Sequence, residues 1–214
     1  MIRQKGISLI ELMVALIIST LLILGVLQLF LNTSNSDRVN NALARVQENG
    51  RIALELIGAD ARRAGFQGCI ASRVVTEIEN GIKLPDHAVS RGNNAVTFRY
   101  AVLDSSAGPA LPDDGDTLAR SCTGTAQTYY LRTAAYTNCD GNLCLNGSAI
   151  LNGAQITGVS YGIPDSNKMI WKANPTDEEI AIAKAVRVNL QVTNASQNIT
   201  RDLSGTFELR NRTQ

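Results

Sequence analysis

The chain has 214 residues, of which 44% are hydrophobic, and 20 Lys and Arg residues against 19 Asp and Glu residues give a formal net charge of +1. A charge this close to zero disfavours a protein whose main surface binds nucleic acid. The length allows one medium-sized domain with its own core and a further segment.

The chain begins with a short basic segment followed by a long apolar one. Arg3 and Lys5 precede residues 7–31, a run of 25 residues whose one ionisable side chain is Glu11. A helix of this length spans about 37 Å, which exceeds the ~30 Å hydrocarbon core of a bilayer. The basic residues predict a cytoplasmic N-terminus with the rest of the chain outside. An ordinary cleaved secretory signal is disfavoured, because the run is long and ends without a small-residue cleavage site.

Glu11 is the unusual residue of this segment. A carboxylate costs about 2.5–3.5 kcal/mol at the centre of a membrane helix and less near its end, where Glu11 lies. One interpretation is that a cation in the membrane pairs with Glu11. The other is a protonated or snorkelling side chain at the interface with no role.

The sequence KGISLIEL around Glu11 resembles the type III signal of type IV prepilins. That signal has a short basic leader, a glycine (here Gly6), a hydrophobic residue, and a glutamate at the fifth position after the cut. The resemblance implies that a prepilin peptidase cleaves between Gly6 and Ile7 and N-methylates Ile7, although phenylalanine is more usual there. The new amino group would lie one helical turn from Glu11, in the same chain or in a neighbouring subunit. In the intersubunit arrangement, the pair with Glu11 would act as a register, because it would fix how neighbouring helices align during assembly.

A second, amphipathic stretch follows the polar sequence NTSNSDRVNN, which we interpret as a flexible juncture or a weak part of one helix. Small and apolar residues then recur every three or four positions. They are Val39, Leu43, Val46, Gly50, Ala53, Ile57, Ala61 and Ala64. Since the first proline is Pro85, the pattern allows one helix from Ile7 to about Ala64. Gly65 or Gly68 would end it, with Arg62 and Arg63 in its last turn.

The remainder of the chain alternates short β-type runs with turn residues. The expected strands are residues 73–79, 94–103, 116–122, 127–135, 153–163, 185–194 and 199–212. The expected breaks are residues 80–87, 104–116, 137–144, 164–171 and 193–198. One short helix is expected within residues 174–185, with Thr176 or Asp177 as its N-cap. The fold class is therefore α+β, with a long N-terminal membrane-spanning helical spine and a mostly antiparallel β-sheet head.

Four cysteines follow the membrane segment, on its predicted outer side. An even number in an oxidising compartment favours two disulfides, with three possible pairings. The short loop CDGNLC favours Cys139–Cys144, which leaves Cys69–Cys122. Zinc is disfavoured because there is no C-x-x-C pair. Calcium at Asp113, Asp114 and Asp116 is disfavoured because the full loop pattern is absent. We expect no metal and no cofactor.

No arrangement of residues in the sequence indicates catalysis, so we expect a protein that is not an enzyme. The single histidine, His87, has no serine or cysteine in a recognisable nucleophile motif. The phosphate-binding sequence of an assembly ATPase is absent as well.

Phrases along the head, RAGFQGC, ITGVSYGI, AVRVNLQVTN and FELRNR, resemble minor pilins of the PilW kind and, in plan, PulJ-type minor pseudopilins of type II secretion. The resemblance implies four regions: a leader (1–6), a transmembrane and assembly helix (7–31), its amphipathic continuation (32–66) and a head containing disulfides (67–214). It also implies a subunit of an initiation or tip complex that promotes pilus assembly, adhesion, twitching motility or DNA uptake. The alternatives are a pseudopilin of type II secretion and a tip adhesin.

The same resemblance implies partners and a location. The partners would be other minor pilins, the major pilin, the prepilin peptidase and the inner-membrane pilus assembly machinery, with no strong signal for nucleic acid. The chain would lie in the bacterial inner membrane with a periplasmic head, and then in the pilus at the cell surface.

Overall fold

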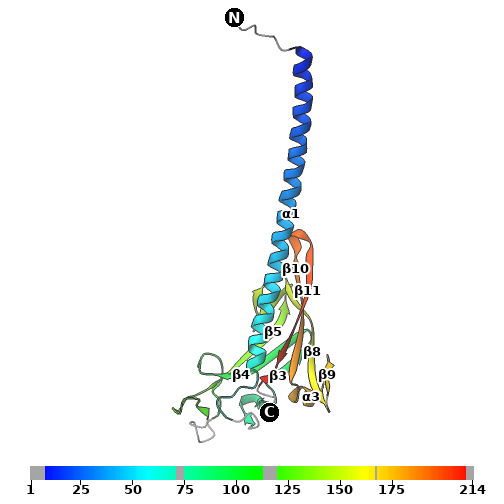
Figure 1. The fold of residues 1–214 in the computed structure, drawn as a ribbon. Coiled ribbons are helices and arrows are strands. Elements are labelled where there is room, and N and C mark those ends of the chain that lie inside the picture. The colour runs from blue at the N-terminus through cyan, green and yellow to red at the C-terminus, as the bar shows by residue number, and fades with distance from the viewer. Residues whose placement is uncertain (1–7, 71–74, 113–119, 167, 211–214) are drawn as a thin grey trace. The chain divides into compact units, whose positions relative to one another are not determined.

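The computed structural model describes residues 8–70, 75–112, 120–166 and 168–210. The chain divides into two compact units, Met1–Ala44 and Arg45–Gln214. Figure 1 shows a long first helix and, in the second unit, strands that form sheets. The expected fold class, a long apolar N-terminal helix followed by mostly antiparallel sheet, is confirmed.

Helix α1 (Leu9–Arg63) is continuous over 55 residues. The polar sequence NTSNSDRVNN, which the sequence leaves open as a juncture or a weak helix, is helical throughout. At the other end, Gly65 has a φ of 83°, in the left-handed region that favours glycine. Arg62 and Arg63 occupy the last turn, where the helix dipole stabilises positive charge. The helix therefore ends within one residue of the expected position.

A five-stranded antiparallel sheet forms one part of the second unit. It comprises β3 (Val89–Gly92), β4 (Ala95–Val102), β5 (Tyr130–Cys139), β6 (Asn142–Leu145) and β7 (Ser148–Leu151), in that order. A small ladder of β1 (Thr76–Glu77) and β2 (Lys83–Leu84) precedes it, with the short helix η1 (Glu79–Gly81) between the two strands.

The second, four-stranded antiparallel sheet has the order β11-β10-β8-β9. Its strands are β8 (Ala154–Asp165), β9 (Lys168–Lys172), β10 (Ala185–Asn194) and β11 (Ile199–Glu208). The helix α3 (Asp177–Ala181) joins β9 to β10, and η2 (Ala195–Gln197) joins β10 to β11. Thr176 caps α3 in a reciprocal capping box with Glu179, as one of the two expected caps.

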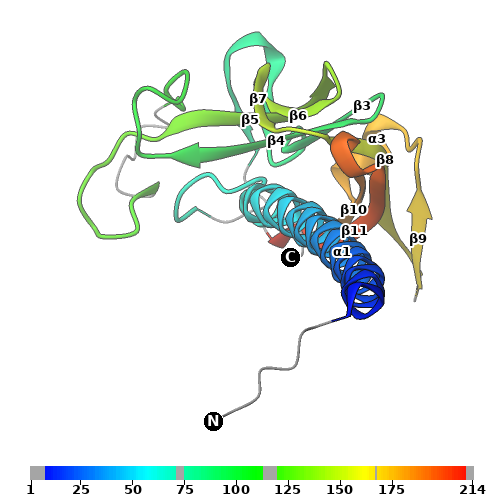
Figure 2. The ribbon, with the colours of Figure 1, turned by 90° about the horizontal axis from the view of Figure 1, so that it is seen from above.

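The core of the second unit forms where the last turns of α1 meet both sheets. Val46, Ala53, Ile57 and Ala61 of α1 are buried with the inward side chains of the strands. Figures 1 and 2 show β10 and β11 running beside this part of the helix. The contact is close at Gly58, where an added Cβ would lie 2.5 Å from Cε1 of Phe207. Gly50 of the apolar stripe is as closely packed, since an added Cβ there would lie 2.7 Å from Cδ1 of Leu203, so these glycines permit close packing of α1 against β11.

Several short strands lie where the sequence predicts breaks or no element. The expected break at residues 137–144 is instead the β5–β6 hairpin. Its turn is Asp140-Gly141, and both residues have positive φ, 46° and 80°. Asp-Gly is a typical two-residue hairpin turn, so this break separates two paired strands. Strand β9 overlaps the expected break at residues 164–171, and the sequence pattern predicts no element at β3 or β7.

Candidate functional site

Glu11 lies in the first turn of α1, four positions from Ile7. Its backbone N–H donates to the carbonyl of Ser8 at 3.0 Å, and its side chain is exposed. Within residues 8–210, as far as the structure describes them, Glu11 makes no ion pair. Gly6 and Ile7 lie outside the described residues, so cleavage, methylation and pairing with a new N-terminus stay predictions.

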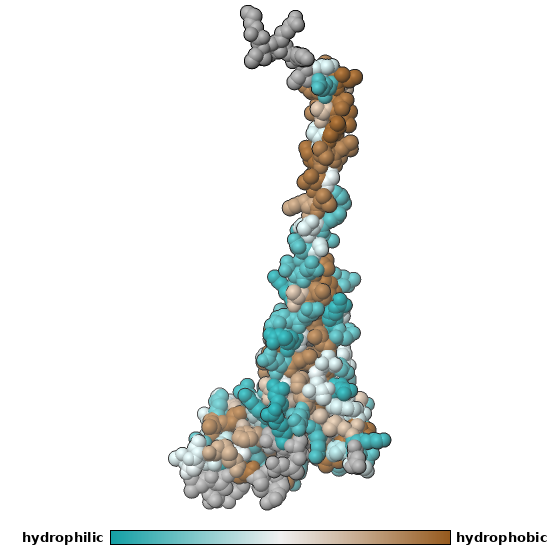
Figure 3. Space-filling model, viewed as in Figure 1, coloured by the Kyte–Doolittle hydropathy of each residue, from teal (hydrophilic) through white to brown (hydrophobic). Residues whose placement is uncertain are grey.

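The first part of α1 is the one stretch among the described helices that is long and apolar enough to cross a membrane. Its aliphatic side chains are exposed, and Figure 3 shows hydrophobic residues over this part of the helix. Its two hydroxyl-bearing residues are satisfied within the helix. Ser19 Oγ donates to the Ala15 carbonyl and Thr20 Oγ1 to the Leu16 carbonyl, both at 2.8 Å. These hydroxyls therefore need no partner outside the helix, whereas the Glu11 carboxylate does.

The cysteines are joined in two pairs in the structure. Cys69, just after α1, is joined to Cys122, with their Cα atoms 5.1 Å apart. Cys139 and Cys144, at the β5–β6 hairpin, have Cα atoms 6.0 Å apart. Both separations lie within the range that disulfides span. The pairing in the purified protein stays a prediction that peptide mapping can test.

Asp60 makes a contact that the sequence does not reveal. The hydroxyls of Tyr100 on β4 and Tyr136 on β5 each donate to one of its carboxylate oxygens, both at 2.7 Å. Burial, and then the neighbouring carboxylate, raise the pKa of both tyrosines, so they remain hydrogen-bond donors well above neutral pH. These contacts tie the end of α1 to the five-stranded sheet.

Asp60 is not part of the apolar stripe of the helix, yet it is half-buried in the structure. One signal was available. A carboxylate near the C-terminal end of a helix is unfavourable with the helix dipole, which suggests a compensating partner elsewhere. The identity of that partner depends on the packing of β4 and β5 against α1, which the local sequence does not contain.

His87 takes part in a turn. Its ring Nδ1 accepts a hydrogen bond from the backbone N–H of Lys83 at 3.0 Å. The backbone N–H of His87 donates to the Lys83 carbonyl at 2.6 Å. An Nδ1 that accepts a hydrogen bond carries no proton of its own. No group of His, Cys, Asp and Glu side chains suited to a metal ion occurs among the described residues. The aspartates considered for calcium, Asp113, Asp114 and Asp116, lie outside them.

Comparison with known proteins identifies the N-terminal segment. Residues 1–27 match the family model described as the prokaryotic N-terminal methylation motif. None of the curated proteins compared with the chain matches it. Among solved structures, the chain is similar to a type IV-like pilin from Thermus thermophilus, with 10% identity, a TM-score of 0.42, and coverage of 79% of this chain and 99% of that one. At this identity and TM-score the likeness supports no inference about this chain.

The chain is thus a helix-first α+β protein that carries a prokaryotic N-terminal methylation motif. The matched residues include the basic leader, Gly6, Ile7 and Glu11. This match confirms the resemblance of the N-terminal segment to type IV pilin-like proteins. Together with the apolar first part of α1, the motif indicates anchoring in a membrane and association with a pilus-like assembly.

Proposed function

We propose that this protein is a minor pilin, a subunit of an initiation or tip complex that promotes assembly of a type IV pilus. The observation that carries the proposal is the methylation motif at the start of an exposed apolar helix whose one ionisable residue, up to Leu31, is Glu11. Exposure of this apolar surface to water is unfavourable. A membrane or a bundle of similar helices would bury it. Through the complex it would support adhesion, twitching motility or DNA uptake.

The proposed sequence of events begins in the inner membrane, with the N-terminus in the cytoplasm and the head in the periplasm. A prepilin peptidase removes residues 1–6 and methylates the amino group of Ile7. The positive terminus and the Glu11 carboxylate then form an ion pair, in one chain or between neighbours. Because buried ion pairs depend strongly on geometry, the intersubunit pair acts as a register for assembly more than as a source of affinity.

The proposed division of labour follows the regions expected from the sequence. Residues 1–6 are the leader, residues 7–31 the transmembrane and assembly helix, and residues 32–66 its amphipathic continuation. The head, residues 67–214, carries the Cys69–Cys122 and Cys139–Cys144 disulfides and contacts partners. These are other minor pilins, the major pilin and the inner-membrane assembly machinery. The role is structural and not enzymatic.

A minor pseudopilin of type II secretion is the second candidate, because the same motif and order of elements suit it equally well. An affinity-tagged full-length chain, isolated from its native cells in mild detergent, separates the two. Recovery of the major pilin and other minor pilins supports the pilus assignment. Recovery of secretion-system components with no pilin replaces it with the pseudopilin assignment.

A further inference from the structure

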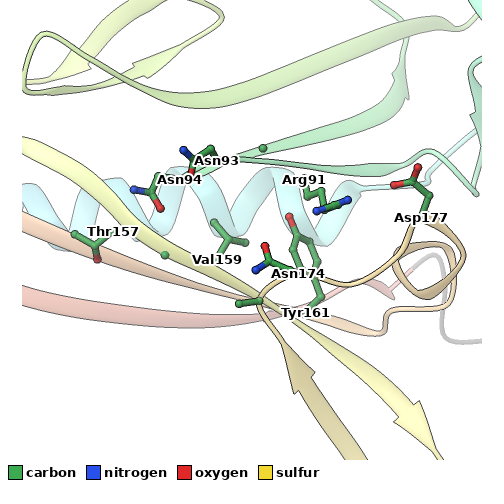
Figure 4. A pocket seen from close by; sticks show the side chains of 11 residues that line it. Arg91, Asn93, Asn94, Thr157, Val159, Tyr161, Asn174 and Asp177 are labelled. Carbon is green, nitrogen blue, oxygen red and sulfur yellow. The ribbon is translucent and has the colours of Figure 1, made fainter.

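A polar cavity of about 700 Å³ lies in the second unit. Three segments far apart in the chain line it: the β3–β4 turn, the middle of β8, and the residues that lead from β9 into α3 (Figure 4). The two sheets thus contribute opposite walls. The volume falls within the about 300–1,000 Å³ typical of small-molecule sites. The assembly role proposed above uses none of its lining residues.

Arg91, at one wall, is a cation with no partner. Its side chain is exposed and makes no hydrogen bond or ion pair with any residue that the structure describes, including Asp177 on the same cavity. A guanidinium presents a planar set of donors that matches a carboxylate in a bidentate arrangement. The cavity therefore offers a carboxylate-binding group that the fold itself does not use.

Tyr161 provides an independent observation. It is 1% exposed, and its hydroxyl has no hydrogen-bond partner in the described structure. Figure 4 shows this hydroxyl pointing toward the Arg91 side chain. Burial raises the pKa of Tyr161 to about 12, so the hydroxyl remains a donor. A buried donor without a partner is unfavourable, and a ligand oxygen within hydrogen-bond distance of this hydroxyl would satisfy it.

The other polar side chains extend the site. Asn93, Asn94 and Asn174 carry amides, Thr157 carries a hydroxyl, and Asp177 carries a carboxylate. Amides both donate and accept hydrogen bonds, whereas a carboxylate only accepts them. Together they can bind sugar hydroxyls, which also both donate and accept. A peptide with apolar side chains fits poorly, because Val159 and the ring of Tyr161 are the only large apolar groups in the lining.

We propose that this cavity binds an acidic saccharide, with the sugar carboxylate on Arg91 and the sugar hydroxyls on the surrounding amides and Asp177. The site would make the head a receptor for carboxylated glycans, whichever assembly contains it. The proposal does not depend on the assembly role, since none of the residues that line the cavity belongs to the N-terminal motif.

Isothermal titration calorimetry of the full chain in detergent micelles tests the proposal. The probes are trigalacturonate, a hyaluronan tetrasaccharide and sialyllactose, with fully methyl-esterified trigalacturonate as the uncharged control. At least one of the three acidic probes is expected to bind. If trigalacturonate binds, its methyl ester is expected to bind at least about tenfold more weakly. Failure of all three acidic probes to bind overturns the proposal.

Variants then locate the site. Arg91→Gln is expected to weaken binding at least about tenfold, because a charge-assisted pair is lost. Tyr161→Phe is expected to weaken binding while remaining folded by circular dichroism. Arg201→Gln, which removes an exposed arginine of β11 outside the cavity, is the matched control and leaves binding unchanged. Equal loss in Arg91→Gln and Arg201→Gln, or no loss in either, contradicts the assignment of the ligand to this cavity.

Discussion

Glu11 differs from every other side chain between Leu9 and Leu31 because it alone is ionisable. Leaving it unpaired in lipid is unfavourable, and pairing it with the amino group of a processed chain removes that cost. In the proposed function, Glu11 would therefore favour the assembled state over the isolated helix in the membrane.

Glu11→Ala should leave membrane insertion intact, because the substitution makes the segment more apolar. Assembly should fall at least about tenfold, because a charge-assisted contact is lost. Membrane fractionation measures the first and the yield of sheared surface pili the second. Ser19→Ala, whose hydroxyl bonds only within the helix, is the control and should assemble normally. Normal assembly of Glu11→Ala would rule out the register.

Asp60→Ala should destabilise the head by about 2–4 kcal/mol, because it leaves the hydroxyls of Tyr100 and Tyr136 without their charged acceptor. Urea unfolding in detergent, followed by circular dichroism, measures the change. Glu55→Ala, which removes an exposed carboxylate from the same helix, should have little effect. A similar, small change in both variants would show that the Asp60 contacts contribute little to stability.

The same tyrosines make stability depend on pH. The pKa values of Tyr100 and Tyr136 in the folded protein lie above the unfolded value of about 10, so at alkaline pH the folded state retains protons that the unfolded state has lost. Stability from this source is complete below about pH 10 and falls as the pH rises further. Urea unfolding at increasing alkaline pH should show the decline, and a Tyr136→Phe variant should show a shallower one. An identical slope in both proteins would exclude Tyr136 as a source.

At the scale of elements, the long periodic segments could be predicted and the short ones could not. Helix α1, β10 and β11 each repeat one pattern over ten or more residues, and their positions follow from it. Strands β3, β6, β7 and β9 have four or five residues each, too few to repeat a pattern. The turn residues around β6 and β9 predict breaks in the sheet, whereas in the structure they connect the paired strands of hairpins.

The candidate functional residues also differ in whether the sequence alone predicts them. Gly6, Ile7 and Glu11 form a local motif, which the sequence alone contains. Asp60, Arg91 and Tyr161 acquire their surroundings from strands distant in the chain, so only the folded arrangement brings their partners or cavity together.

The two disulfides close loops of different length, so their removal should lower the free energy of unfolding by different amounts. Cys69 and Cys122 are 53 positions apart, whereas Cys139 and Cys144 are five apart. The loop-entropy model gives a loss of about 4 kcal/mol for the first and about 2 kcal/mol for the second. The double variants Cys69→Ser/Cys122→Ser and Cys139→Ser/Cys144→Ser, compared by urea unfolding in detergent, measure the two losses. Equal destabilisation, or a free thiol in the unmodified protein, would contradict this account.

At the scale of the whole molecule, the two units support different activities. The apolar first part of α1 suits a membrane and a bundle of helices, and the head presents a polar cavity suited to a ligand. In the proposed function, processing at the N-terminus would create the charge that pairs with Glu11, and the pair would bring the head into an assembly.

The most direct test of this account is the intact mass and N-terminal sequence of the protein purified from its native cells. The account predicts a chain that begins at Ile7 with one methyl group on its amino nitrogen, and a Gly6→Val variant that retains residues 1–6. A native protein that retains the leader, or that is cut at another position, would contradict it.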